Sequence, residues 1–444
     1  MMKYEDAITY IEECNLLGSI PGLDSIRELT AAIGNPQDEL KFVHVAGTNG
    51  KGSVSSFVAT VLQCCGLKVG RYISPTIFTY RERFQINGRM MSKKELGEEM
   101  GLIKEACDVL VSQGKPHPTS FEIETALAFH FFHKKQCDMV VLETGMGGTL
   151  DATNIIKNPL VCVLTSISMD HMQFLGDSLS EIATNKCGII KERSRVVSAM
   201  QPDEAEAVVK DVCREKNVSL VFADASQAEY IPLGKAGKPS LEKQAFIFEG
   251  ERYEISLLGK YQIENAVTAI KVLQELRAIG YLRITDDKMK KGLLATQWKG
   301  RFSLIADKPY FVVDGAHNVA AAKKLVQSIQ FYFTNRKIVY IMGMFRDKEY
   351  EKVIQITAPF ASQIITVATP GNPRALPAVE LAQAVRLVNP NVTSADSLEE
   401  AVEMSYLFAD KESVIIGFGS LSFLGELMNI VEDNRAVRSD THGK

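Results

Sequence analysis

Apolar residues along the chain follow two alternating patterns. Short runs rich in β-branched and aliphatic residues, typical of buried strands, are separated by longer stretches with apolar residues every three or four positions, typical of helices. Because strands that alternate with helices favour parallel pairing, this part of the chain predicts a doubly wound, mostly parallel α/β sheet. The predicted strands are 41–46, 68–73, 138–143, 160–167 and 194–200.

The pattern changes between residues 218 and 257. A polar stretch is followed by two apolar runs that meet at Glu249-Gly250, which predicts a β-hairpin attached in antiparallel fashion to the main sheet. Residues 261–280 then have helical spacing and end at Gly280, the residue type that commonly terminates a helix.

Strand and helix patterns alternate again in the last third of the chain, which predicts a second, smaller Rossmann-like α/β domain of ordinary size. We therefore expect two domains, 1–296 with the phosphate loop described below and 297–444. The four strands predicted for the second domain are 310–318, 337–345, 362–370 and 413–420.

Composition restricts the class of protein. With 444 residues, of which 46% are hydrophobic, the chain is long enough for two cores. A net charge of −4 argues against nucleic acid or an anionic membrane as the main partner. The first residues do not resemble a signal peptide, and no apolar run approaches the roughly 20 residues of a membrane span. Eight scattered cysteines without a CxxC pair fit a reducing cytoplasm.

A glycine-rich segment, HVAGTNGKGSVSS at residues 44–56, joins the first predicted strand to a helix. The backbone N–H groups of such a turn, together with the positive end of the helix, attract phosphate. The segment departs from the GxxxxGK[ST] pattern, because Val45 replaces the first glycine and Gly52 follows Lys51. Its strand and helix context still favours a nucleotide site over an incidental turn, with Lys51 near the outer phosphates and Ser53 near Mg²⁺.

Polar residues also follow other predicted strands, at the edge where open α/β sheets bind ligands. Glu143 ends the run at 138–143 and is suited to hold Mg²⁺ across from the phosphate loop. Asp170 and His171 follow the next strand, and a histidine there is more often structural than a metal ligand.

Three further residues receive a structural assignment from their spacing. His130 and His133 lie three positions apart among aromatic residues, which indicates a core helix and no metal site. Lys186 has the spacing of a solvated lysine on a helix.

Eight motifs occur in order along the chain: GTNGKGS, SPTIFTYRERFQING, LETGMGGTLDATN, SISMDHMQFLGDSLSEIATNKCGIIK, LLGKYQIENA, WKGRF, DGAHN and TPGNPRALP. Together they resemble the folylpolyglutamate synthase and dihydrofolate synthase family of the Mur ligase superfamily, from about residue 3 to residue 430. Members of this family carry GTNGKGS as their ATP loop, so the unusual spelling is itself diagnostic.

The resemblance implies an ATP-dependent amide ligase that adds L-glutamate to reduced folates, and to dihydropteroate, through an acyl phosphate, with ADP and phosphate as products. It also implies two Mg²⁺ ions and closure of the two domains around the reactants. The implied ATP-binding residues are Gly47, Thr48, Asn49, Gly50, Lys51, Gly52, Ser53, Gln262, Asn265, Arg301, Asp314 and His317. The implied metal ligands are Ser53, Ser74, Glu143, His171 and a carbamylated Lys186, and the implied catalytic residues are Lys51, Lys186 and His317.

The acceptor side is less well defined. Thr76 and Thr149 stand where the family often has histidine and arginine, and both lie near the inferred pterin side. The loop after Ser74 is the expected wall of the acceptor site, with an ordinary surface loop as the alternative. Its rings would stack on the pterin and its arginines would pair with carboxylates: Phe78, Tyr80, Phe84, Arg81 and Arg83.

Three other functions remain open. A cell-wall Mur ligase normally has an additional N-terminal domain, whereas about 40 residues precede the phosphate loop here. A P-loop regulatory ATPase would not need Arg301 or the DGAHN motif. A monofunctional ligase that only extends the glutamate tail of folates is not separated from a bifunctional one by these motifs. We expect a cytoplasmic monomer that acts on small molecules.

Overall fold

The computed structural model describes residues 2–16, 18 and 22–441. The chain forms two compact units, and each is described by itself. Unit 1 comprises Met1–Pro75, Thr79–Ala228 and Glu264–Thr296, and unit 2 comprises Thr76–Phe78, Glu229–Ile263 and Gln297–Lys444. The domain limits expected from the sequence, 1–296 and 297–444, stay a prediction.

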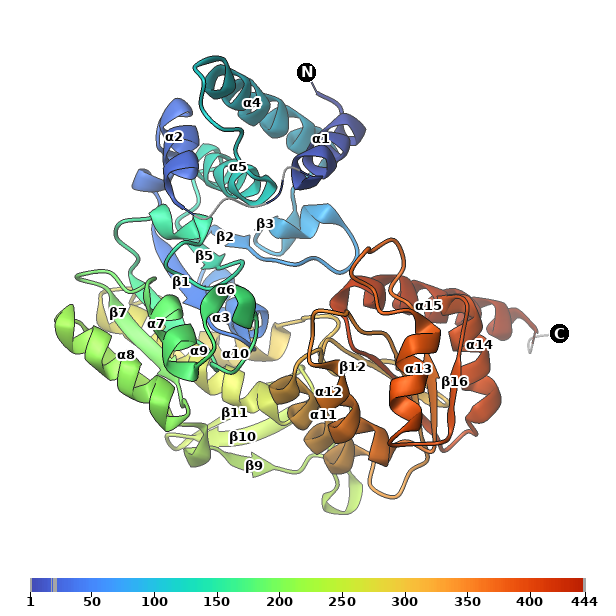
Figure 1. Ribbon diagram of the computed structural model, residues 1–444. Coiled ribbons are helices and arrows are strands. Elements are labelled where there is room, and N and C mark those ends of the chain that lie inside the picture. Colours follow the sequence, from blue (N-terminus) through green and yellow to red (C-terminus); the bar gives the residue numbers. More distant parts are fainter. Residues whose placement is uncertain (1, 17, 19–21, 442–444) are drawn as a thin grey trace. The chain divides into compact units, whose positions relative to one another are not determined.

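Unit 1 is built on an eight-stranded sheet with the order β4-β3-β2-β5-β1-β6-β7-β8 (Figure 1). Its five predicted strands are all present, and their parallel pairing confirms the α/β class. The parallel strands are β1 (Phe42–Ala46), β2 (Val69–Tyr72), β5 (Met139–Glu143), β6 (Val161–Leu164), β7 (Arg195–Ala199) and β8 (Ser219–Ala223). The antiparallel strands are β3 (Phe84–Ile86) and β4 (Arg89–Met90).

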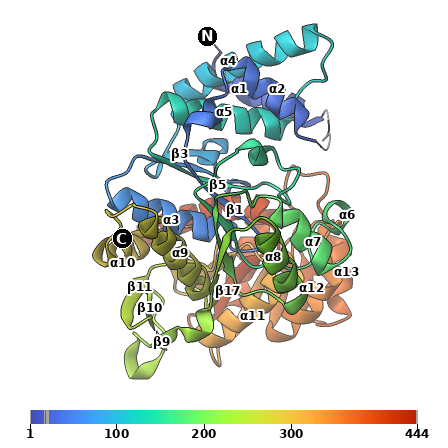
Figure 2. The same cartoon turned by 90° about the vertical axis from the view of Figure 1, so that its left-hand side faces the viewer.

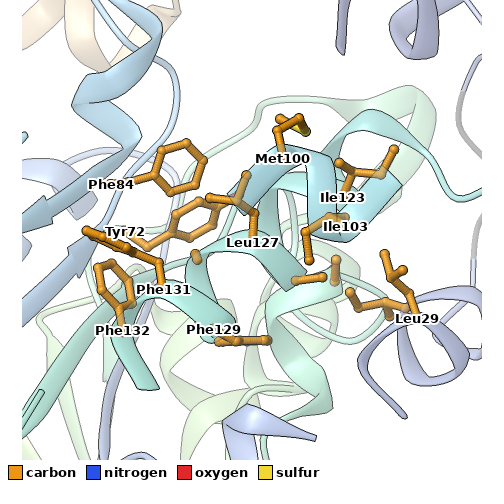
Figure 3. Close-up of a cluster of buried hydrophobic side chains, with 14 of the residues drawn as sticks. Leu29, Tyr72, Phe84, Met100, Ile103, Ile123, Leu127, Phe129, Phe131 and Phe132 are labelled. Carbon is orange, nitrogen blue, oxygen red and sulfur yellow. The ribbon is translucent and has the colours of Figure 1, made fainter. Parts of the chain in front are cut away.

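Four helices form a layer on one face of this sheet, as Figures 1 and 2 show. They are α1 (Tyr4–Leu16), α2 (Asp24–Ala32), α4 (Lys93–Ser112) and α5 (Ser120–Lys134). The core beneath them takes alternate residues of the strands, such as Tyr72 and Phe84, and apolar residues of α5 such as Leu127 and Phe129 (Figure 3). Helices α4 and α5 begin at capping boxes, Ser92 with Glu95 and Thr119 with Glu122.

The opposite set of alternate strand residues faces helix α3 (Lys51–Cys64), which packs on β1, β2 and β5. This helix also contacts α10 (Asp286–Ala295). The remaining helices of unit 1 are α6 (Met172–Leu175), α7 (Leu179–Cys187), α8 (Asp203–Glu215) and most of α9 (Tyr261–Ala278).

The hairpin predicted at Glu249-Gly250 is confirmed, because both residues have positive φ, 51° and 78°, between antiparallel strands. Its predicted attachment to the main sheet is wrong. The hairpin strands pair with a third short strand in a separate sheet of order β11-β10-β9, while β8, which was not predicted, occupies the edge of the main sheet. The three strands are β9 (Glu229–Ile231), β10 (Gln244–Phe248) and β11 (Glu251–Ile255).

Unit 2 contains a six-stranded sheet of order β12-β13-β17-β14-β15-β16, parallel except for β12. Apolar cores lie on both faces of this sheet. The strands are β12 (Ser303–Asp307), β13 (Tyr310–Asp314), β14 (Ile338–Met342), β15 (Gln363–Thr366), β16 (Val392–Ser394) and β17 (Val414–Phe418). The helices are α11 (Val319–Tyr332), α12 (Tyr350–Thr357), α13 (Ala378–Arg386), α14 (Leu398–Phe408) and α15 (Leu424–Thr441).

Two general features bear on function. No helix among the described residues is long and apolar enough to cross a bilayer. All eight cysteines are free thiols.

Candidate active site

The glycine-rich segment has the geometry of a phosphate loop. It leaves the carboxyl end of β1 and enters α3, whose first residue is Lys51. Gly50 precedes this helix with a φ of 91°, and a Cβ there would lie 2.5 Å from Oδ1 of Asn265. Both the backbone conformation and this close approach require glycine at the position. Asn265 of α9 therefore lies directly against the loop.

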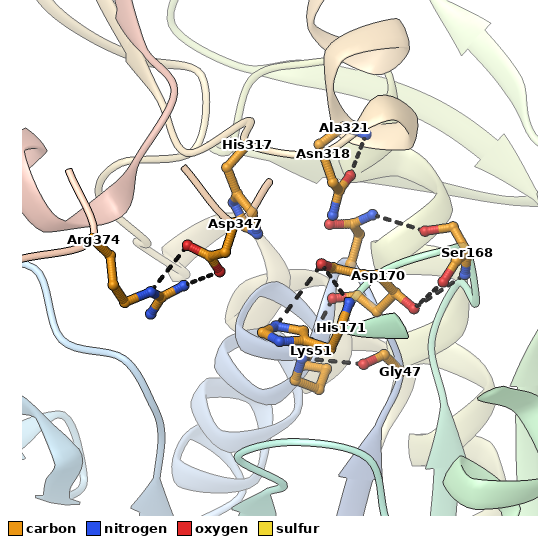
Figure 4. A network of polar contacts seen from close by, with 12 residues as sticks. Gly47, Lys51, Ser168, Asp170, His171, His317, Asn318, Ala321, Asp347 and Arg374 are labelled. Atoms are coloured by element: carbon orange, nitrogen blue, oxygen red, sulfur yellow. Dashed lines mark hydrogen bonds and ion pairs between the residues drawn. The ribbon is translucent and has the colours of Figure 1, made fainter. Parts of the chain in front are cut away.

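The loop is held by the segment that follows β6. Thr48 Oγ1 lies 3.0 Å from both the carbonyl oxygen and the amide nitrogen of Ser168, accepting from the amide and donating to the carbonyl. Lys51 Nζ donates to the carbonyls of Gly47, at 3.1 Å, and Thr48, at 3.4 Å (Figure 4). The Lys51 ammonium group is therefore folded back on the loop, and both of these acceptors are neutral carbonyls.

Other candidate ligands follow the neighbouring strands at the same edge of the sheet. Glu143, 4% exposed, is the last residue of β5 and lies beside Val45 of β1 in the strand register. Ser53 is buried in the first turn of α3, and Ser74 follows β2. His171 follows β6 with a φ of 51°, and its Nε2 lies 3.9 Å from the Asp170 carboxylate.

Lys186 departs from the solvated position that its spacing predicts. Its side chain is buried at the end of α7, and its Nζ donates to the Gly47 carbonyl at 2.9 Å. Burial, with a smaller contribution from the Lys51 charge, lowers the pKa of Lys186 to about 7, against the opposing charges of Asp170 and Asp151. A large fraction of this amine is therefore neutral at neutral pH.

Oxygen donors of the kind that Mg²⁺ prefers lie beside the phosphate loop. Within the described ranges, no three His, Cys, Asp or Glu side chains come together as a metal site. Mg²⁺ in nucleotide enzymes commonly uses one or two carboxylates together with hydroxyls, waters and phosphate oxygens. Glu143 and Ser53 supply groups of this kind beside the loop, so the residues fit a metal bound together with a nucleotide.

In unit 2, Asp314 ends β13 and its carboxylate is fully engaged in hydrogen bonds. Oδ2 accepts from the Tyr261 hydroxyl at 2.7 Å and from the Phe302 amide at 2.8 Å. Oδ1 accepts from the Ala316 amide at 2.8 Å. Burial raises the pKa of Asp314, and these donors and Arg301 oppose the rise. Sequence reasoning missed Tyr261, although it adjoins Gln262 in the YQIENA motif.

The DGAHN turn also fixes two other predicted residues. A Cβ at Gly315 would collide with Nη1 of Arg301, so this glycine lets the guanidinium lie across the turn. The His317 ring contacts the Gly315 carbonyl through Nδ1 at 2.7 Å. Asn318 caps α11 by accepting from the Ala321 amide at 2.9 Å (Figure 4).

Gln262 and the two histidines of α5 lie in other surroundings than the phosphate loop and the DGAHN turn. Gln262 is fully buried in the first turn of α9. His130 and His133 pair with Glu99, at 2.5 Å, and with Glu39, at 3.0 Å.

The expected acceptor wall is partly wrong. Phe84 is fully buried in the core and packs against Tyr72, with 5.9 Å between ring centroids, so it is not available to stack on a ligand. Arg83 lies 3.2 Å from the buried carboxylate of Glu124, and Arg81 donates to the Met91 carbonyl at 3.0 Å.

A separate cavity of about 700 Å³ lies in unit 2. It is lined by residues such as Tyr310 and Arg336, at the amino ends of the strands, and contains none of the predicted site residues. We therefore assign the candidate site to the polar groups at the carboxyl ends of the strands.

Two family models match the chain. The Mur ligase middle domain matches residues 45–273, and the Mur ligase glutamate ligase domain matches residues 300–421. These stretches contain the phosphate loop and the DGAHN turn.

Curated relatives match most of the chain. The dihydrofolate synthase/folylpolyglutamate synthase of Bacillus subtilis (strain 168) is 32% identical over 428 residues, which are 96% of this chain and 98% of the relative. The folylpolyglutamate synthase of Lacticaseibacillus casei is 34% identical over 384 residues, which are 85% of this chain and 88% of the relative.

Solved structures match as well. Mycobacterium tuberculosis folylpolyglutamate synthase complexed with ADP and AMPPCP has a TM-score of 0.86 and 27% identity, and covers 95% of this chain and 97% of its own. FolC of E. coli in complex with DHPP and ADP has a TM-score of 0.82 and 26% identity, and covers 97% of this chain and 98% of its own.

Proposed function

Because this chain belongs to the folylpolyglutamate synthase and dihydrofolate synthase family of Mur ligases, we propose that its strand-end residues carry out the family's ATP-dependent ligation. The enzyme is an ATP-dependent amide ligase that adds L-glutamate to folates. Its use of ATP is supported by the relatives solved with ADP.

The need for ATP follows from the chemistry of an amide bond. A carboxylate repels an approaching amine, and its oxygen is a poor leaving group. Attack of one carboxylate oxygen on the γ-phosphorus of ATP forms an acyl phosphate and releases ADP. The neutral amine of glutamate then attacks the acyl carbon, the bond to the phosphate oxygen breaks, and the amine proton is lost.

Gly47 to Ser53 are proposed to bind the ATP phosphates. The backbone of this loop precedes α3, so its N–H groups and the helix dipole favour an anion at this point. Lys51 is proposed to turn from the Gly47 carbonyl to the transferring phosphoryl group. Fixed positive charge beside developing negative charge is commonly the largest catalytic contribution.

Mg²⁺ is proposed to be held by Ser53, Ser74, Glu143, His171 and the carbamate of Lys186. When bound, the metal would neutralise phosphate charge. The support is the position of Glu143 beside the loop and the burial of Ser53 in its first turn.

We propose that Lys186 is carbamylated. The reaction joins the neutral amine to CO₂ and releases one proton, giving an anionic oxygen donor in place of an ammonium. Support comes from burial of this lysine and from its pKa of about 7, because both favour the neutral nucleophilic amine.

The nucleoside is proposed to contact Gln262 and Asn265, and the phosphates Arg301 and His317. Asn265 is supported by its contact with the loop at Gly50. Asp314 is proposed to act by fixing the turn that carries His317, since its oxygens already accept three hydrogen bonds.

The next proposal concerns which substrates accept the glutamate. We propose that this enzyme uses both dihydropteroate and reduced folates, as the name of the B. subtilis relative describes. The alternative is a monofunctional folylpolyglutamate synthase, favoured by the L. casei relative of similar identity. A cytoplasmic location, supported by eight free thiols, and a monomeric state are further proposals.

A steady-state assay of ADP formation tests the function. Purified protein receives ATP, Mg²⁺ and glutamate with either dihydropteroate or tetrahydrofolate, and matched reactions omit glutamate. We expect glutamate-dependent turnover with both acceptors. Turnover with tetrahydrofolate alone would leave a tail-extending synthase, and no turnover with either acceptor would contradict the folate assignment.

A further inference from the structure

Arg71 is a partly buried cation on the main sheet that no motif predicts. It lies on β2, between β3 and β5, and its register partners are Gln85 and Val141. Side chains in register share a face, and residues two apart along a strand share it too. Arg71 therefore faces the same side as Glu143, the last residue of β5, which lies two residues beyond Val141.

The guanidinium joins this strand to the phosphate-loop helix. Nη1 donates to Ser56 Oγ at 2.6 Å, and Ser56 Oγ donates to the Gly52 carbonyl at 2.7 Å. Nη2 donates to Oε1 of Gln85 at 2.6 Å, and Gln85 Nε2 donates to the Glu82 carbonyl at 2.8 Å. One side chain thus connects α3, β2 and the end of the loop that follows Ser74.

The surrounding charges explain how the cation is tolerated. Burial lowers the pKa of Arg71 to about 10, and the carboxylates of Glu143 and Glu82 oppose this lowering. An isolated buried charge is costly, whereas a buried charge with partners of opposite sign and hydrogen bonds is tolerated. Glu143, itself 4% exposed, receives part of its compensation from Arg71.

We propose that Arg71 is a positioning residue for the metal–nucleotide site, holding the Glu143 carboxylate and the first turn of α3 in a fixed relation. This inference rests on the proposed function, because it assigns the purpose of Glu143. Ser53 belongs to α3 and Ser74 follows β2, two elements that Arg71 joins, while Glu143 ends β5, which pairs with β2. Arg71 need not touch the nucleotide to act on it.

Two substitutions at Arg71 separate the effect of its charge from the effect of its shape. Arg71→Met keeps much of the side-chain volume but leaves Glu143 without this countercharge. Arg71→Lys keeps the charge and loses the two-pronged hydrogen bonding to Ser56 and Gln85. Arg71→Met should therefore lower the free energy of unfolding most when Glu143 is ionised. Arg71→Lys should have an intermediate effect on the same quantity.

A double-mutant cycle on the nucleotide-free protein tests the charge relation. Urea unfolding is measured for wild type, Arg71→Met, Glu143→Gln and the double variant. We expect the double variant to be more stable than the sum of the single changes predicts. Strict additivity would overturn the proposal, whether or not the protein has ligase activity. If Arg71→Met does not fold, Arg71→Gln replaces it in the cycle, because it also removes the positive charge.

Calorimetric titration of Mg²⁺ in the presence of saturating ADP tests the positioning. We expect Arg71→Lys to weaken Mg²⁺ binding by about 10- to 100-fold, the usual effect of losing a partner of a metal ligand. Arg195→Lys is the matched control, because Arg195 also lies on a strand of this sheet and pairs with Glu275 at 2.6 Å. Equal Mg²⁺ affinity in both variants would reduce Arg71 to a structural residue. Absence of ligase turnover in the wild type would instead contradict the proposed function.

Discussion

The two sheets present their polar groups in contrasting ways at their carboxyl ends. In unit 1, Lys51 and Lys186 both donate to the Gly47 carbonyl, at 3.1 and 2.9 Å. In unit 2, Asp314 accepts hydrogen bonds from Tyr261 and from the backbone of Phe302 and Ala316. The first region holds two lysine amines on one neutral acceptor, and the second surrounds a carboxylate with three donors.

This difference indicates a division of labour. A cation held by a neutral carbonyl can transfer to a phosphate oxygen at little cost, because the anion is the stronger acceptor. A buried carboxylate with its donors in place resists rearrangement, since an unsatisfied partner would carry a desolvation penalty. We therefore expect Lys51 and Lys186 to react or move, and Asp314 to hold its surrounding turn in place.

The largest expected effect concerns Lys51 of unit 1, one of the lysines that we expect to react or move. Lys51→Ala should lower kcat by about 10³-fold, because it removes a charge aimed at the transferring phosphoryl group. The circular dichroism spectrum should be unchanged, since the hydrogen bonds that the ammonium group makes to Gly47 and Thr48 both go to carbonyls of the loop itself. Lys41→Ala, an exposed lysine before β1, is the control and should retain activity. Near-normal turnover of folded Lys51→Ala would refute the role.

The second effect concerns the hydrogen bonds that hold Asp314 in unit 2. Asp314→Asn keeps the shape of the side chain but turns an amide group toward N–H or O–H donors that need an acceptor. We expect a loss of about 2 kcal/mol in unfolding free energy, the cost of an unsatisfied buried donor. Urea unfolding and the KM for ATP should change together. Full stability in this variant would mean that the donors find other partners.

The third effect follows the pKa of Lys186. Because burial lowers this pKa to about 7, the neutral amine increases as pH rises through that value. The neutral fraction should grow about tenfold from pH 6 to pH 8 and then level off. At a fixed total concentration of ¹³C-labelled bicarbonate, the fall in dissolved CO₂ with rising pH offsets the proton that carbamylation releases. The carbamate signal in ¹³C NMR should therefore follow this curve. A signal that keeps rising to pH 10, or that persists in Lys186→Ala, would contradict the assignment.

The smallest effect measures what the Tyr261 hydroxyl contributes to the hydrogen bonding of Asp314. Tyr261→Phe removes one of three donors to Asp314 and leaves both backbone donors in place. We expect a loss of about 1 kcal/mol in unfolding free energy. The cost should disappear when Tyr261→Phe is made in an Asp314→Ala background. An equal cost in both backgrounds would show that the hydroxyl acts elsewhere.

Local patterns predicted the elements better than the surroundings of single side chains. Five parallel strands of unit 1, β1, β2, β5, β6 and β7, were evident as apolar runs, and the glycine loop was evident from its position between strand and helix. The edge strand β12 was missed, because its residues are only partly buried and lack a continuous apolar run.

Burial of charged residues was not predictable in this way. Lys186 was read as solvated from helix spacing, but its acceptor is the carbonyl of Gly47, which is 139 positions earlier in the chain. Phe78 and Phe84 belong to one motif, yet one is 41% exposed and the other is fully buried. The alternation of β3 explains Phe84, which turns toward the core while Gln85 faces α3.

The most direct test of the account follows an oxygen atom. Tetrahydrofolate labelled with ¹⁸O in its reactive carboxylate is incubated with enzyme, ATP, Mg²⁺ and glutamate, and the released phosphate is analysed by mass spectrometry. Formation of an acyl phosphate requires one carboxylate oxygen to leave with the phosphate, so the account predicts one ¹⁸O in each phosphate. Unlabelled phosphate, formed at the rate of amide synthesis, would contradict it.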